Sequence, residues 1–349
     1  MRQPADQRAT RLARHRSIAL ELALTSDRRL GERVASAGPL GSGIGGRSAE
    51  LLVGGVRVFV KRVPLTDLEL RPEHLRSTAN VFGLPTHYQY GIGSAGFGAW
   101  RELAAHQLTT DWVLGGDHPG FPLLHHWRVL PDTPPPGFAD EFGGIDGAVA
   151  HWDGSPAVRR RLEAIGAASA SLVLFLEHLP WTLADWLTER AGPDRGAGQV
   201  AAALTGGADF LRAQGFVHFD AHFRNVLTDG RLVCFADLGL ALSRRFELSA
   251  PERAFLAAHL GYDRVYVVGH LLRHHLLDGV RDHAGYEAFL RGWLAGERPA
   301  GLPAAAVALL DRHAAALAGQ AAFHRRLLTE SRRTPYPAGE IDGAGPADA

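Results

Sequence analysis

Three oxygen-bearing side chains stand in a fixed order in the middle of the chain. Asp220 and Asn225 share one stretch, and Asp237 opens the later triplet Asp-Leu-Gly. Between them, Asp229-Gly230 separates two short apolar runs, which is typical of a β-hairpin. All three side chains could then face one cavity. Carboxylate and amide oxygens are the ligands that a hard cation such as Mg²⁺ takes, usually together with substrate phosphates.

The same stretch resembles the catalytic loop of the protein-kinase-like superfamily. That loop follows the pattern H-x-D-x-x-x-x-N, and its fixed positions are filled by His218, Asp220 and Asn225. Asp237 stands where the family has D-F-G, with Leu238 replacing phenylalanine. A surface hairpin would also explain Asp and Asn, because both are common in turns. Matching residue types at fixed offsets on both sides of one hairpin favour the kinase-like interpretation.

The resemblance implies ATP-dependent transfer of the γ-phosphoryl group to a hydroxyl, with ATP and Mg²⁺ as cofactors. Asp220 would orient the acceptor hydroxyl and take its proton, and His218 is assigned to the same catalytic set. Asn225 and Asp237 would hold Mg²⁺ against the phosphates. The polar positions keep their residue types, which argues against a pseudokinase that binds nucleotide without turnover.

A glycine-rich segment and a lysine complete the nucleotide site that the resemblance implies. Gly41, Gly43 and Gly46 satisfy G-x-G-x-x-G. A dinucleotide site would need a helix next, but a strand, a Gly-Gly turn and a second strand ending at Lys61 follow. In kinases the glycines cover the phosphates, and the lysine binds the α- and β-phosphates and is counted here as catalytic. The alternative is a flexible glycine-rich loop without this role.

The resemblance also requires a carboxylate, carried on a helix, that pairs with the lysine. We predict Glu102 as this partner, with Glu69 and Glu73 as rivals. The stretch of sequence between Lys61 and Glu102 is longer than in ordinary kinases, and residues 80–98 account for most of the difference. This insertion, rich in glycine and aromatic residues, is either a substrate surface or a packed loop.

The order of elements after these residues also resembles a kinase. A continuous apolar run over residues 171–176 predicts a buried strand. The break that follows it resembles the kinase hinge, where the backbone binds the adenine edge, and so places nucleotide contacts at Glu177 and Leu179. Farther on, Asp263 begins a predicted buried helix and is a candidate anchor for the backbone of the catalytic loop.

The segment after Asp237 is short. Ser249-Ala250-Pro251-Glu252 spells the kinase A-P-E motif, but it comes too soon for an ordinary activation segment. The same residues predict the start of a helix, with Ser249 as N-cap and Glu252 as its capping partner. We therefore predict that there is no long activation loop controlled by phosphorylation.

Composition limits the classes of protein to which the chain can belong. With 349 residues, 46% hydrophobic and 21% charged, it is typical of a soluble globular protein. Lys+Arg and Asp+Glu both number 37, so no net charge favours nucleic acid or an anionic membrane as partner. The single cysteine excludes an internal disulfide, and no apolar run approaches a membrane span. The N-terminus has no signal-peptide pattern, and we expect a cytoplasmic protein.

We predict an α+β fold of the bilobal protein-kinase-like type, with a small antiparallel β-sheet lobe followed by a helical lobe. The expected parts are an N-terminal helical extension (1–33), the sheet lobe (34–177) with insertions at about 80–98 and 131–157, the helical lobe with the catalytic loop and the Asp-Leu-Gly triplet (178–333), and a disordered tail (334–349). The second insertion is rich in Pro, Gly and acidic residues, which predicts a long loop.

Two features of the sequence favour different acceptors for the phosphoryl group. Ser/Thr kinases of the eukaryotic type carry lysine two residues after the catalytic Asp, where this chain has His222. That loop resembles aminoglycoside and choline phosphotransferases, whereas the glycine segment is closer to protein kinases. We predict Ser or Thr of a protein or peptide, such as a peptide natural-product precursor, with a small-molecule alcohol as the alternative. A metallohydrolase built on His218, Asp220 and His222 is disfavoured, because no further histidine-rich element is spaced to complete the metal shell.

Overall fold

A computed structural model describes the chain in two compact units. The residues described are 5–135, 137–189, 197–277 and 282–342. The first unit comprises Met1–Leu179 and Asp237–Glu252, and the second comprises Pro180–Ala236 and Arg253–Ala349. Helices and antiparallel strands make up both units, in agreement with the predicted mixture of helices and a small antiparallel sheet.

The first unit is built on an antiparallel sheet of five strands in the order β1-β2-β3-β5-β4. Its strands are β1 (Gly38–Gly43), β2 (Gly46–Val53), β3 (Val56–Leu65), β4 (Leu124–Pro131) and β5 (Ala170–Glu177). The short strand β10 (Leu242–Ser243) lies in the later part of this unit, Asp237–Glu252. Its helices are α1 (Ala5–Leu24), α2 (Asp27–Ala35), α3 (Ala99–Gly115), α4 (Gly144–His151) and α5 (Pro156–Gly166), with 3-10 turns at Pro72–His74, Thr86–Gln89 and Asp140–Phe142.

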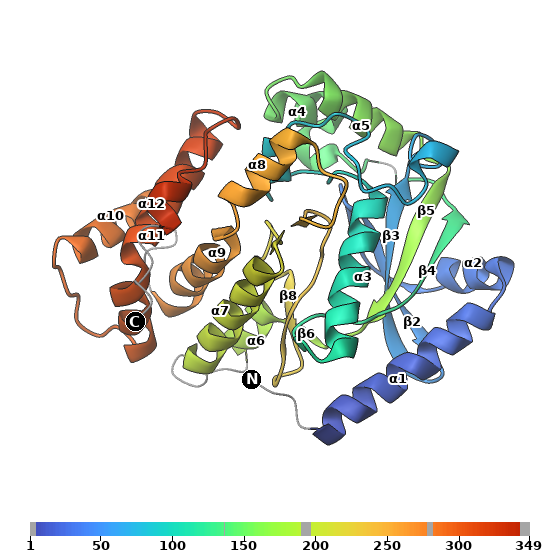
Figure 1. Ribbon diagram of the computed structural model, residues 1–349, viewed down its shortest axis with the longest axis horizontal. Coiled ribbons are helices and arrows are strands. Elements are labelled where there is room, and N and C mark those ends of the chain that lie inside the picture. The colour runs from blue at the N-terminus through green and yellow to red at the C-terminus, as the bar shows by residue number, and fades with distance from the viewer. Residues whose placement is uncertain (1–4, 136, 190–196, 278–281, 343–349) are drawn as a thin grey trace. The chain divides into compact units, whose positions relative to one another are not determined.

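Alternation along the strands decides which helix covers which face of this sheet (Figure 1). Val58 and Val60 of β3 belong to the apolar cluster formed with α1 and α2. Val63 and Leu65 belong instead to the cluster formed with α3. Because successive side chains of a strand point to opposite faces, Lys61 shares the α3 face with Val63.

Glycines make the two tight turns at the start of the sheet. Gly54 and Gly55 join β2 to β3 with φ of +55° and +76°, as a two-residue turn of the primed type requires. Gly46, at the start of β2, has φ +123°, and a Cβ there would lie 2.2 Å from the carbonyl oxygen of Arg62. The predicted glycine segment followed by strand, turn and strand is confirmed, and the glycine segment itself forms strand β1.

The two insertions pack together, and the second of them is partly helical. The sequence predicts a long loop over residues 131–157, but the structure has α4 and the beginning of α5 there. Side chains of this segment share an apolar core with residues 80–98, and the rings of Tyr88 and Trp152 meet edge-on with centroids 4.7 Å apart. The prediction of a loop was wrong because this helix is stabilised by packing against a segment distant in sequence, which leaves no strong local pattern.

The second unit is mainly helical, with a small sheet in the order β6-β8-β9. Its helices are α6 (Leu183–Glu189), α7 (Ala197–Ala213), α8 (Ala250–Ala258, which begins in the first unit), α9 (Tyr262–Leu271), α10 (His283–Leu294), α11 (Ala304–Thr329) and α12 (Ala338–Asp342), with a π-helical turn at Leu272–Leu276. Its strands are β6 (Trp181–Thr182), β7 (Phe216–Val217), β8 (Val226–Thr228) and β9 (Val233–Phe235). The predicted hairpin is present, and Val226 pairs with Phe235 across it.

Both ends of the described chain are more closely packed than the sequence indicates. The expected N-terminal extension forms α1 and α2, which contribute side chains such as Ile18 and Leu30 to the core of the first unit. Disorder was predicted from residue 334 onward, yet Ile341 is buried and the ring of Tyr336 stacks on His259 at 4.4 Å. Residues 343–349 lie outside the described residues.

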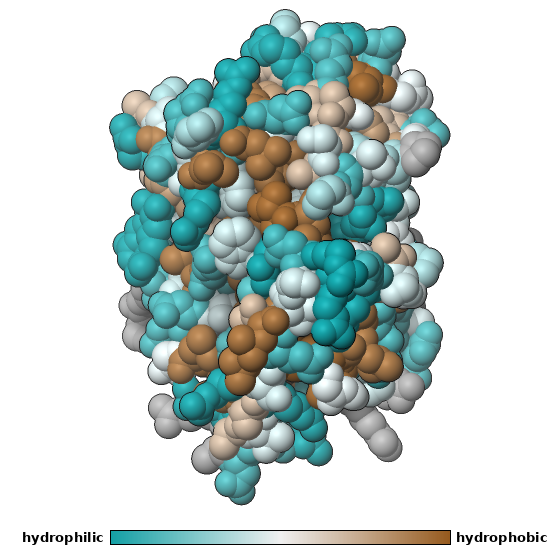
Figure 2. Space-filling model, turned by 90° about the vertical axis from the view of Figure 1, so that its right-hand side faces the viewer, coloured by the Kyte–Doolittle hydropathy of each residue, from teal (hydrophilic) through white to brown (hydrophobic). Residues whose placement is uncertain are grey.

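Hydrophobic residues at the surface are distributed in separate patches. Figure 2 shows such patches among hydrophilic residues on one side of the molecule. The most exposed large ones include Leu20 and Leu24 of α1 and Leu52 of β2. Scattered exposed leucines are ordinary for a folded protein. Among the described helices, none combines the length and the apolar character needed to cross a membrane.

A partly buried ion pair fastens α1 to the sheet, and its loss should destabilise the first unit. Arg11 is bonded to the carboxylate of Glu177 at 2.7 Å and to the carbonyl oxygen of Phe121 at 2.5 Å. Arg11→Ala would leave Glu177 without its cation, and we expect it to lower the free energy of unfolding by about 3 kcal/mol. Arg28→Ala removes an exposed pair with Glu32 on α2, and should change that free energy by no more than about 0.5 kcal/mol.

Chemical denaturation of the two variants measures both effects. Equal losses of stability would show that the Arg11 pair does not fasten α1.

Candidate functional site

Lys61 lies between two carboxylates of the first unit. Its Nζ is 2.7 Å from Glu102 Oε1 and 2.7 Å from Asp237 Oδ1. The side chains of Lys61 and Glu102 are 12% and 4% exposed, whereas that of Asp237 is 45% exposed. Glu102 is therefore the buried partner, and Asp237 keeps a side that faces solvent.

Of the three glutamates considered from the sequence, Glu102 is the one that contacts the lysine. Glu69 is buried and accepts hydrogen bonds from the amide of Ala99 and from Arg161, each at 2.7 Å. It therefore fixes the start of α3. Glu73 lies exposed in a 3-10 turn. The sequence could not choose among them, because the choice depends on which turn of α3 faces β3.

The electrostatics keep the lysine charged. Burial lowers the pKa of Lys61, but the carboxylates of Asp237 and Glu102 outweigh that effect and raise it above its ordinary value. Burial raises the pKa of Glu102, and the ammonium group of Lys61 opposes the rise. The result is a fixed positive charge beside a partly exposed carboxylate. This pairing suits a polyphosphate that carries a hard cation.

In the second unit, Asp263 of α9 holds the backbone of the loop that carries His218 and Asp220. Its Oδ2 accepts from the amide of His218 at 2.6 Å, and its Oδ1 accepts from the amide of Phe219 at 3.0 Å. Phe219 has φ +66°, which is unfavourable for a bulky residue, so these two bonds help to impose the conformation. Asp263 is thus the anchor that the sequence suggested. Burial raises its pKa to about 7, and the two amide bonds act in the opposite direction.

The ring of His218, which the motif assigns to the catalytic set, contacts the backbone through both of its nitrogens. It is 0% exposed. Its Nε2 lies 2.8 Å from the carbonyl oxygen of Ala236, and its Nδ1 lies 3.2 Å from the amide of Asp220. Nδ1 therefore accepts and Nε2 donates, so the imidazole is neutral and both nitrogens are engaged with the backbone. This also removes the basis for a metallohydrolase that would use His218 as a ligand.

Asp220 and Asn225 are joined directly within the second unit. Nδ2 of Asn225 donates to Asp220 Oδ2 at 2.9 Å and to the carbonyl oxygen of Asp220 at 3.0 Å. With its amide nitrogen turned to Asp220, Asn225 presents Oδ1 as the acceptor for a cation. Nε2 of His222 lies 3.8 Å from Asp220 Oδ1. The carbonyl oxygen of Asn225 accepts from the amide of Ala236 at 2.8 Å, which closes the base of the hairpin.

The predicted glycine positions lie at the tip of the β1–β2 hairpin. Gly41 and Gly43 belong to β1, where every residue is exposed, and Gly46 begins β2. A Cβ at Gly43 would meet nothing within 4 Å, whereas Gly46 has no room for one. Gly46 is thus required by the turn itself, and the other two leave the backbone open to a ligand.

The predicted hinge residue Glu177 is already engaged within the first unit. Its carboxylate accepts from Arg11 at 2.7 Å and from the amide of Leu123 at 3.1 Å, and its own amide donates to Leu123 at 2.8 Å. The carboxylate and the amide of Glu177 are therefore occupied, and its contact with an adenine stays a prediction. Leu179 is half-buried at the last residue of the continuous part of the first unit.

The Asp-Leu-Gly triplet belongs to the first unit, whereas the sequence analysis placed it in the helical domain. The reason is a set of contacts that join the segment Asp237–Glu252 to α3 and to the residues before it. Two residues that the sequence analysis missed, Gln89 and Arg101, take part in these contacts. In the sequence, the one feature that could have drawn attention to Arg101 is its position directly before Glu102.

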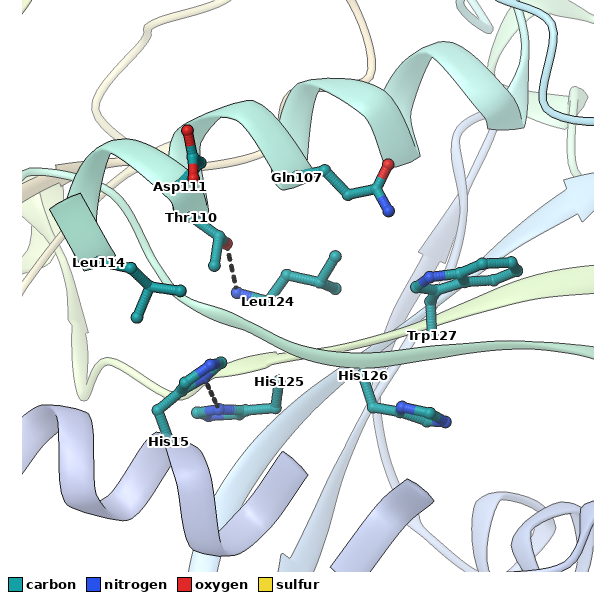
Figure 3. A pocket seen from close by; sticks show the side chains of 9 residues that line it. All are labelled: His15, Gln107, Thr110, Asp111, Leu114, Leu124, His125, His126 and Trp127. Atoms are coloured by element: carbon teal, nitrogen blue, oxygen red, sulfur yellow. Dashed lines mark hydrogen bonds between the residues drawn. The ribbon is translucent and has the colours of Figure 1, made fainter. Parts of the chain in front are cut away.

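A separate pocket of about 390 Å³ lies between α1, α3 and β4 (Figure 3). In its lining, Nδ1 of His15 and Nδ1 of His125 are joined by a hydrogen bond of 3.0 Å. Burial lowers the pKa of both histidines, to about 3 for His125, so the pair is neutral near pH 7. In the part of the chain that the structure describes, no three His, Cys, Asp or Glu side chains are grouped to hold a metal ion.

No protein-family model matches this chain, and no curated protein matches it.

The buried carboxylate of Asp263 should make stability depend on pH. Between its ordinary pKa of 3.8 and the folded value of about 7, the folded state holds a proton that the unfolded state has lost. The contribution of Asp263 to stability therefore falls as pH rises through this window. Denaturant unfolding from pH 4.5 to pH 7.5 should show wild type losing stability relative to Asp263→Asn. Parallel curves for the two proteins would contradict the raised pKa.

Proposed function

We propose that the protein is an ATP-dependent phosphotransferase with a bilobal, protein-kinase-like fold. It moves the γ-phosphoryl group of ATP to a hydroxyl, in the first place to Ser or Thr of a protein or peptide in the cytoplasm. The observation that carries the proposal is the position of Lys61, 2.7 Å from Glu102 and 2.7 Å from Asp237. In protein kinases the corresponding lysine–glutamate pair and the metal-binding aspartate must both be in place for activity.

In this proposal the first unit binds the nucleotide. Lys61 pairs with the α- and β-phosphates, and the glycine hairpin from Gly41 to Gly46 covers them with backbone amides. Asp237, with 45% of its side chain exposed, presents carboxylate oxygen to a cation. Mg²⁺ takes one or two carboxylates together with phosphate oxygens, so the carboxylate of Asp237 and the amide oxygen of Asn225, to which the kinase resemblance assigns the cation, are each of a type that it binds. When bound, Mg²⁺ would neutralise charge on the transferring phosphoryl group.

The second unit supplies the group that handles the acceptor. Asp220 orients the hydroxyl and accepts its proton late in the transfer, while Asn225 fixes the carboxylate through its amide nitrogen. His218 and Asp263 position this loop by bonds to its backbone and do not touch substrate.

A small-molecule alcohol is the second candidate acceptor. It is favoured by His222, whose ring lies 3.8 Å from Asp220, because this position differs from Ser/Thr kinases of the eukaryotic type. The short length of the segment Asp237–Glu252 also favours a small-molecule acceptor. The glycine hairpin at Gly41–Gly46 favours the protein or peptide acceptor, and we keep that as the first choice.

Replacing either aspartate should abolish ATP consumption. For Asp220→Asn we expect a fall of at least about 100-fold with ATP binding retained, because only the proton acceptor is lost. For Asp237→Asn we expect a similar fall together with loss of Mg²⁺-dependent ATP binding. Asp146→Asn removes an exposed carboxylate of α4 and should leave both quantities unchanged.

The assay follows Mg²⁺-dependent ATP consumption and ATP binding by purified protein, first alone and then with Ser/Thr peptides and aminoglycosides. Phosphorylated peptide would support the first acceptor class, and phosphorylated aminoglycoside the second. Binding of ATP with no turnover on any acceptor would favour a pseudokinase. A wild-type protein that binds no nucleotide would refute the proposal.

A further inference from the structure

We propose that Arg101, Gln89 and Glu252 hold the segment Asp237–Glu252 permanently in its working position, so that Asp237 is presented without any phosphorylation of the segment. The inference rests on the proposed function, because the role of the segment is to carry Asp237. It assigns a positioning role to three residues that no sequence motif marked.

The C-terminal end of the segment is fixed by a buried ion pair. Nη2 of Arg101 is 2.6 Å from Glu252 Oε1, and the two side chains are 3% and 4% exposed. Nε of Arg101 donates to the carbonyl oxygen of Thr78 at 2.6 Å. Arg101 is followed on α3 by Glu102, which contacts Lys61 at 2.7 Å. One turn of one helix therefore holds both the lysine and the end of the segment.

The start of the segment is held by the insertion before α3. The side-chain amide of Gln89, which is 2% exposed, donates to the carbonyl oxygen of Leu240. Gly96 has φ +73°, and a Cβ there would lie 2.7 Å from the carbonyl oxygen of Gly239. The insertion thus approaches the segment so closely that only glycine fits at this point.

The middle of the segment is held by two hydroxyl groups. The amide of Glu247 donates to Thr78 Oγ1 at 2.8 Å, and the hydroxyl of Ser77 donates to the carboxylate of Glu247. The segment is therefore bonded at its start, middle and end, and every one of these partners lies in the first unit.

The segment carries only two hydroxyl groups, one of them buried and the other, at the surface, engaged in a helix cap. It contains no Thr or Tyr, and its only hydroxyl residues are Ser243 and Ser249. Ser243 is 1% exposed. Ser249 caps α8, with its hydroxyl 2.8 Å from Glu252 Oε2 and its amide 2.9 Å from the same oxygen. The predicted capping box is thus present, and it occupies the second hydroxyl.

A built-in carboxylate takes the place that a phosphate has in regulated kinases. Phosphorylated activation loops become ordered through new pairs between arginine and phosphate. Here Arg101 already pairs with Glu252, which is charged without modification. Because an arginine buried without a partner is costly, arrangements of the segment that separate Arg101 from Glu252 are disfavoured.

The decisive variant is Glu252→Gln. Glutamine also serves as the partner in a capping box, so the start of α8 is kept while the charge is lost. We expect the gain in ATP affinity that Mg²⁺ provides to fall by about tenfold, because Asp237 is no longer fixed. Amide hydrogen exchange in residues 237–252 should become faster. Affinity for ATP without Mg²⁺ should stay as in wild type.

Glu69→Gln is the matched control. It neutralises another buried glutamate of the first unit, paired with Arg161 at 2.7 Å with both side chains at most 3% exposed. The hydrogen bonds of the Glu69 carboxylate are to residues 66, 99 and 161, none of them in the segment. We expect it to lower stability without changing the Mg²⁺-dependent gain or the exchange of residues 237–252.

The inference is overturned if Glu252→Gln behaves like Glu69→Gln in both measurements. It is also overturned if removal of phosphate from active wild-type protein by a phosphatase abolishes activity and mass spectrometry finds the lost phosphate in residues 237–252. A wild-type protein that binds no ATP would refute the proposed function instead. Hydrogen exchange of Glu252→Gln would then still decide whether the pair holds the segment.

Discussion

The first unit depends on the need of a buried ammonium group for carboxylate partners. Lys61 loses most of its hydration on the α3 face of the sheet, and Glu102 and Asp237 compensate at 2.7 Å each. This requirement fixes the rotation of α3 over β3 and the approach of the segment that carries Asp237. The apolar cluster of α3 with Val63 and Leu65 keeps the helix where the ion pair needs it.

In the second unit, a buried acidic group likewise orders the loop that carries Asp220. Asp263 is buried, and its carboxylate accepts two backbone amides from residues 218 and 219. In both units an acidic side chain on a helix therefore positions the polar residues proposed for the chemistry. Asp220 and Asp237 can thus present oxygens to solvent while their backbones stay fixed, which is the preorganisation that phosphoryl transfer uses.

Local patterns made part of the site predictable. The hairpin between Asn225 and Asp237 follows from its turn residues and short apolar runs, and the alternation in β3 predicts a strand that ends near Lys61. The capping box of Ser249 and Glu252 is a signal over four residues and was interpreted correctly. The resemblance to kinases supplied the roles, and the geometry within each unit is compatible with them.

What the sequence by itself determined is the set of polar residues and the turns and strands next to them, because these depend on neighbours in the chain. Tertiary structure decided the burial of His218, the choice of Glu102, the helix within residues 131–157 and the pair of Arg101 with Glu252. Each of these depends on packing between segments far apart in the chain. Such contacts leave no periodicity and no fixed spacing, so no local pattern could indicate them.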